Sequence, residues 1–117
     1  MTAEARALAQ ALLNHHRQMC RSRTSDQRNT DSCVIPYGLL CEQADVSYLT
    51  YTVGRFLQEV AEWCHANDWP PINSLVVNKD TRMPGDGYDG APGCSLLQWP
   101  ETVTACIEFD GYPEVVS

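Results

Sequence analysis

Two consecutive prolines, Pro70 and Pro71, separate a strongly periodic segment from a glycine-rich one. Proline donates no backbone hydrogen bond and restricts the preceding residue to extended geometry, so a helix cannot continue through the pair. Before the prolines, apolar residues recur every three or four positions, which forms one apolar stripe on a helix. They are Leu49, Val53, Phe56, Leu57, Val60, Trp63 and Cys64. We predict a long helix with Ser47 as its N-cap, ending at about Ala66, with Asn67 as its C-terminal cap.

After the prolines, the composition favours extended chain and a shaped loop. Residues 75–77 are apolar and largely β-branched, which predicts a short strand, and residues 78–80 have turn composition. Residues 83–94 hold four glycines, two prolines and two aspartates, and glycine permits positive φ or close backbone approach. Residues 101–109 alternate apolar and polar side chains at period two, so we predict a strand, with an amphipathic helix as the alternative.

Two further helices are predicted before the long one. Residues 2–20 keep their apolar side chains to one face, which indicates a helix, and residues 21–34 are expected to form a flexible polar loop. Pro36 suits the first turn of a short helix through residue 44, followed by a turn at 45–46. A short helix, a turn and a longer helix make the outline of a helix-turn-helix.

These elements predict an α+β fold. We expect a single domain over residues 1–117, because a chain of this length buries about 65% of its unfolded surface and supports one ordinary core. Three N-terminal helices would be followed by a small antiparallel sheet with a glycine- and proline-rich wing. Residues 1–20 would form the first helix, and residues 35–117 a winged-helix-like body.

Short motifs occur in a characteristic order between residues 35 and 97. They are Pro36-Tyr37-Gly38-Leu39, Val53-Gly54, Pro71-Ile72, Gly87-Tyr88, Gly90, Gly93 and Leu96-Leu97. In this order they resemble the winged-helix domain of the O-alkylguanine-DNA alkyltransferases and their non-catalytic alkyltransferase-like relatives. The resemblance covers about half of the chain and implies a DNA-binding domain.

Alkyl transfer requires a cysteine thiolate activated by a neighbouring histidine, since only the thiolate is a competent acceptor. The family carries this pair in the segment after the Pro-Ile motif, where residues 73–78 of this chain contain neither cysteine nor histidine. Tyr51 stands where the family has its inserting arginine. The resemblance therefore implies a module that binds and does not react.

Other catalytic or metal-binding patterns are absent from the sequence. There is no GxxxxGK[ST], GxSxG, HExxH or CxxC motif, so we predict neither enzymatic activity nor a cofactor. His15 and His16 point about 100° apart on a helix and have no partner ligand three or four residues away. Asp86 and Asp89 lack the further oxygen ligands of a calcium loop, so no metal is expected.

The six cysteines are expected to remain thiols, and Cys64 falls on the apolar stripe of the long helix. Met1 is followed by a polar helix rather than a basic and then apolar signal segment, and no long apolar run follows. We therefore expect a cytoplasmic protein without membrane contact.

Charge is distributed unevenly. Residues 1–28 have a net charge of +3 and the remaining residues −10, for a total of −7. An acidic body is repelled by phosphates, so electrostatics favour a protein partner with a basic surface over nucleic acid. Small size and acidity are typical of inhibitors, immunity factors and regulators carried by phages and mobile elements. The alternative is a nucleic-acid-binding winged-helix module, with the basic N-terminal region holding phosphates.

The candidate binding residues lie on the exposed face of the long helix and in the glycine-rich loop. They are Tyr48, Tyr51, Thr52, Arg55, Gln58, Glu59, Glu62, Asp86, Tyr88 and Asp89. Tyrosines and Arg55 could stack on or hydrogen-bond to nucleic acid, whereas the carboxylates suit a basic protein surface.

Overall fold

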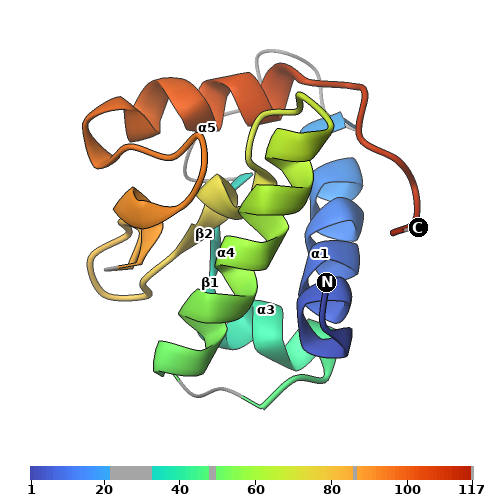
Figure 1. Ribbon diagram of the computed structural model, residues 1–117, viewed down its shortest axis with the longest axis vertical. Helices are drawn as coiled ribbons and strands as arrows, with labels where there is room; N and C mark the ends of the chain where they lie inside the picture. The colour runs from blue at the N-terminus through green and yellow to red at the C-terminus, as the bar shows by residue number, and fades with distance from the viewer. Residues whose placement is uncertain (22–32, 48–49, 86, 117) are drawn as a thin grey trace.

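The computed structural model describes residues 1–21, 33–47, 50–85 and 87–116, with backbone only at Arg21 and residues 50–52 (Figure 1). Within these residues the α-helices are α1 (Ala3–His16), α3 (Tyr37–Ala44), α4 (Thr50–Ala66) and α5 (Trp99–Glu108). A π-helical turn, η1 (Arg17–Arg21), follows α1, and 3-10 turns lie at η3 (Ile72–Leu75), η4 (Tyr88–Gly90) and η5 (Leu96–Gln98). Helices α1 and α4 pack side by side, and α5 crosses one end (Figure 1).

The predicted α+β fold with a small antiparallel sheet is wrong. The described part of the chain is mostly helical, and its two strands, β1 (Ile35–Pro36) and β2 (Val76–Val77), pair in parallel. Ile35 pairs with Val76, so α3 and α4 form the crossover that a parallel connection requires. The glycine-rich segment of the expected wing forms η4 and turns instead of a hairpin within the described residues.

The strand predicted at residues 101–109 is also wrong, because this segment belongs to helix α5. Pro100 lies in the first turn, where its missing N–H costs nothing, and Glu101 adds a negative charge near the helix N-terminus. The buried residues are Trp99, Val103, Cys106 and Ile107, whose spacing is helical. Burial at Cys106 decides between the two periods, because a strand would place it on the exposed face.

The predicted long helix across residues 53–64 is confirmed as α4. It is described from Thr50 onward, and residues 48–49, which separate it from the predicted N-cap Ser47, lie outside the described residues. At the other end, Asn67 follows the last helical residue as predicted, and the next residue, Asp68, has φ 58°. The Trp69 N–H donates to the Cys64 carbonyl at 2.9 Å, which is the six-to-one hydrogen bond of a Schellman motif.

The two shorter helices confirm their predictions. Thr2 caps α1 by accepting a hydrogen bond from the Ala5 N–H through Oγ1 at 3.2 Å. Helix α3 starts directly after Pro36 and stops where Asp45 adopts φ 56°. The flexible loop predicted over residues 21–34 lies mostly outside the described residues.

The core joins the inner faces of α1, α4 and α5 to β2. Its largest fully buried side chains include Leu8, Leu12, Val53, Val60, Ile72, Leu75 and Val77. All six cysteines are buried free thiols, as predicted. An aromatic chain runs from Trp63 through Trp69 to Tyr112 with centroid separations of 5.0 and 6.0 Å, and it covers the junction at the two prolines.

Candidate binding face on helix α4

One face of α4 carries four of the predicted binding residues: Arg55, Gln58, Glu59 and Glu62. Spacing of three and four residues places them as neighbours on the helix surface. Arg55 and Glu62 are exposed, whereas Gln58 and Glu59 are half-buried. Together with Thr2 and Phe56 they line a groove of about 480 Å³. We call these four residues the α4 face.

Glu59 fastens the chain's N-terminal segment to this face. Its carboxylate accepts hydrogen bonds from the Thr2 N–H and from Thr2 Oγ1, both at 2.9 Å. Because both carboxylate oxygens are engaged, Glu59 contributes to the shape of the groove as well as its charge. Glu62 and Arg55 are the charges of the α4 face that are most exposed to solvent.

The loop of residues 84–93, called here the glycine loop, lies against the α4 face. Gln58 Nε2 donates to the Gly87 carbonyl at 3.3 Å. On the far side of the loop, Asp89 Oδ1 accepts a hydrogen bond from the Leu96 N–H at 2.8 Å. Gln58 therefore contacts the loop that carries Asp89, and the Asp89 carboxylate is used to hold the loop.

Tyr88 is buried, with 6% of its surface exposed, so its ring supports the loop from inside. Its hydroxyl and the Ser74 hydroxyl lie 2.7 Å apart, and burial raises the pKa of the Tyr88 phenol well above its usual value. Four other candidate positions cannot be placed on the face: Tyr48 and Asp86 lie outside the described residues, as do the side chains of Tyr51 and Thr52.

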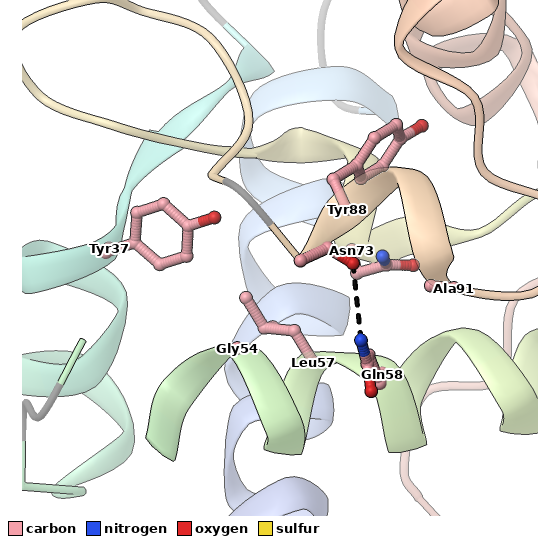
Figure 2. A pocket seen from close by; sticks show the side chains of 8 residues that line it. Tyr37, Gly54, Leu57, Gln58, Asn73, Tyr88 and Ala91 are labelled. Carbon is pink, nitrogen blue, oxygen red and sulfur yellow. Dashed lines mark hydrogen bonds between the residues drawn. The ribbon is translucent and has the colours of Figure 1, made fainter. Parts of the chain in front are cut away.

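A small cavity lies beneath the glycine loop (Figure 2). Its volume is about 20 Å³. It is lined by Tyr37, Gly54, Leu57, Gln58, Asn73, Gly87, Tyr88 and Ala91. Figure 2 shows the elements that supply the lining: Tyr37 comes from α3, Leu57 and Gln58 come from α4, and Tyr88 comes from the loop, with its ring pointing away from Leu57 and Gln58.

Asn73 is the polar residue of this cavity that sequence reasoning missed. It is 4% exposed, and its Oδ1 has no hydrogen-bond partner within the described part of the chain. Its Nδ2 donates to Cys94 Sγ at 3.6 Å. The available signal was an amide side chain two positions after Pro71, between Ile72 and the apolar run at residues 75–77.

Tyr37 fixes the beginning of the glycine loop. The Gly85 N–H donates to the Tyr37 hydroxyl at 2.8 Å. A Cβ at position 85 would lie 2.5 Å from that hydroxyl oxygen, so the close approach requires glycine. The loop is thus held by side chains of α3 and α4 at separate points.

The thiols near this region are poor nucleophiles at neutral pH. Burial raises the pKa of Cys64 to about 11 and the pKa of Cys106 to about 12, and it also raises the pKa of Cys94. Since the thiolate is the reactive form, Cys64, Cys94 and Cys106 remain protonated and unreactive at pH 7.

The two adjacent histidines do not form a common site. His15 Nε2 lies 2.7 Å from the Cys33 carbonyl, whereas the buried His16 Nε2 lies 2.7 Å from the Cys106 carbonyl. Among the described residues, no three His, Cys, Asp or Glu side chains are grouped as a metal site would require. No described helix combines the length and apolar character needed to cross a membrane.

No family model, curated protein or solved structure matches this chain. The resemblance to the alkyltransferase winged-helix domain therefore stays a prediction.

Proposed function

We propose that this chain is a non-catalytic interaction module that binds a protein with a basic surface through the α4 face and the adjoining glycine loop. The observation that carries the proposal is the groove beside α4. Its lining holds two carboxylates, Glu59 and Glu62, and one guanidinium, that of Arg55. Charge complementarity of this kind guides association and sets partner choice. An inhibitor or regulator of a basic protein would use such a surface.

The charge around the groove supports a basic partner. Glu4 lies two positions after Thr2, which lines the groove, and it is exposed in the first turn of α1. Arg55 is the only arginine or lysine of α4. A phosphate backbone approaching this face would meet more negative than positive charge, and the repulsion would lower its affinity.

Arg17, one of the arginines of the basic N-terminal region, is committed to internal hydrogen bonds. The Arg17 guanidinium donates to the Glu114 carbonyl at 2.9 Å and also bonds to Asn14. It therefore holds the C-terminal segment against α1. The raised pKa values of the buried thiols further support binding without covalent chemistry.

The proposal is tested by titrating the full chain against two fluorescent probes, an arginine- and lysine-rich peptide and a duplex DNA, each at low and moderate salt. We expect the peptide to bind and Glu62→Lys to weaken it about tenfold, which corresponds to about 1.4 kcal/mol. The matched control is Glu108→Lys, an equal charge change at an exposed position of α5.

The control separates a defined face from general acidity. Equal weakening by Glu62→Lys and Glu108→Lys would contradict binding at the α4 face. Tight duplex binding that falls steeply with salt and is lost in Arg55→Glu would replace the protein partner with nucleic acid.

A further inference from the structure

The cavity under the glycine loop has a polar floor with an unused acceptor. Asn73 is 4% exposed, and its Oδ1 has no hydrogen-bond partner among the residues that the structure describes. The amide Nδ2 donates to Cys94 Sγ at 3.6 Å, so the amide nitrogen is already used. A buried acceptor without a donor is unfavourable, and native proteins satisfy nearly all such groups.

The size of the cavity limits what can satisfy this oxygen. A volume of about 20 Å³ exceeds the roughly 10–15 Å³ that one water molecule requires, and leaves no room for a planar organic ligand. The described residues that line it include no carboxylate, so among them a buried ammonium ion would find no counter-charge. The occupant must be small, neutral and able to donate a hydrogen bond.

The cavity wall offers such an occupant further polar neighbours. Gln58 contributes a side-chain amide among the lining residues, whereas the Tyr37 and Tyr88 hydroxyls already bond to Gly85 and Ser74. The floor consists of buried residues, including Asn73 and Leu57, whereas Gly87 at the rim is exposed. A water molecule needs two to four polar partners, and the side-chain amides of Asn73 and Gln58 offer two.

We propose that the cavity is a binding site for one ordered water molecule, which donates a hydrogen bond to Asn73 Oδ1 and bridges η3 to α4 and the glycine loop. This water completes the hydrogen bonding of Asn73. It also adds a contact beneath the loop to those that Tyr37 and Gln58 make with Gly85 and Gly87. The proposal rests on the cavity and does not depend on the partner.

The direct test is a high-resolution crystal structure of the wild-type protein. We expect an isolated water peak at about 2.7–3.2 Å from Asn73 Oδ1. A collapsed or empty cavity, or density for a molecule larger than water, would overturn the proposal.

A second measurement uses water-to-protein magnetisation transfer by NMR, which detects a long-lived water near the Tyr88 and Gly87 amides. Asn73→Leu removes the acceptor and should abolish this transfer. The matched control Asn14→Leu, at an exposed position of α1, should leave it unchanged. If the transfer persists in folded Asn73→Leu, Asn73 does not hold the water and the proposal fails.

Discussion

Gly54 lies inside α4, and replacing it with alanine should stabilise the protein. A Cβ built at this position meets no described atom within 4 Å, so the added methyl group causes no clash. Glycine in a helix interior costs about 0.5–1 kcal/mol relative to alanine, because its unfolded chain has more conformational freedom to lose. We expect Gly54→Ala to raise the free energy of unfolding by this amount.

The gain should be visible in both chemical and thermal unfolding. For a chain between the small and mid-sized domains, 1 kcal/mol shifts Tm by roughly 3–6 °C. Urea denaturation should show a higher midpoint with an unchanged slope, since the surface exposed on unfolding is the same.

Gly93→Ala is the opposing control. Its Cβ would also find room, with the nearest described atoms, His65 Nδ1 and Pro71 Cγ, at 4.0 Å. Gly93 has φ 74°, however, a conformation that costs a non-glycine residue about 1–2 kcal/mol. The same substitution should therefore destabilise the protein at this position. A Gly54→Ala variant that is no more stable than wild type would refute the reasoning, since it would show that helix propensity does not limit α4.

Three further predictions concern buried groups. Burial raises the pKa of Cys64 from 9.0 to about 11 and the pKa of Cys106 from 9.0 to about 12. The stability that these protonated thiols contribute is therefore complete below pH 9, and above it the free energy of unfolding should fall by about 1.4 kcal/mol per thiol per pH unit. Urea midpoints at pH 8 and 10 measure this loss. Burial lowers the pKa of His15 from 6.5, so the stability contributed by the neutral imidazole is present above pH 6.5 and falls as the pH drops. Urea midpoints at pH 7 and 5 should show this fall, and His15→Gln should remove it. Trp99→Phe removes the 2.9 Å hydrogen bond from Nε1 to the Ser74 carbonyl, and calorimetry should show a loss of about 1–3 kcal/mol.

The sequence predicted α4 well because several signals agree there. The apolar stripe has helical spacing, Asn67 follows its end, and two prolines prevent continuation. The segment at 101–109 carried conflicting signals: Val103, Ala105 and Ile107 alternate as in a strand, while Pro100 suits a helix start. The burial of Cys106 in the folded core favours the helix, and no local sequence pattern reveals that burial.

The parallel pairing of β1 with β2 could not be predicted from local sequence. Each strand is two residues long, too short for alternation to show, and the partners are separated by α3 and α4. The role of Asn73 was hidden for the same reason. Asn73 lines one cavity with Tyr88 and Leu57, which come from segments that meet only in the folded chain.

The absence of an antiparallel wing from the described residues changes which candidate residues can meet a partner. A hairpin would hold its own shape through a backbone ladder, whereas the glycine loop is held by side chains, including Tyr37, Gln58 and Asp89. Gln58 and Asp89 are therefore partly committed to internal hydrogen bonds. Arg55 and Glu62 are the exposed charges of the α4 face, so charge reversal at these two positions separates a basic protein partner from phosphate most directly.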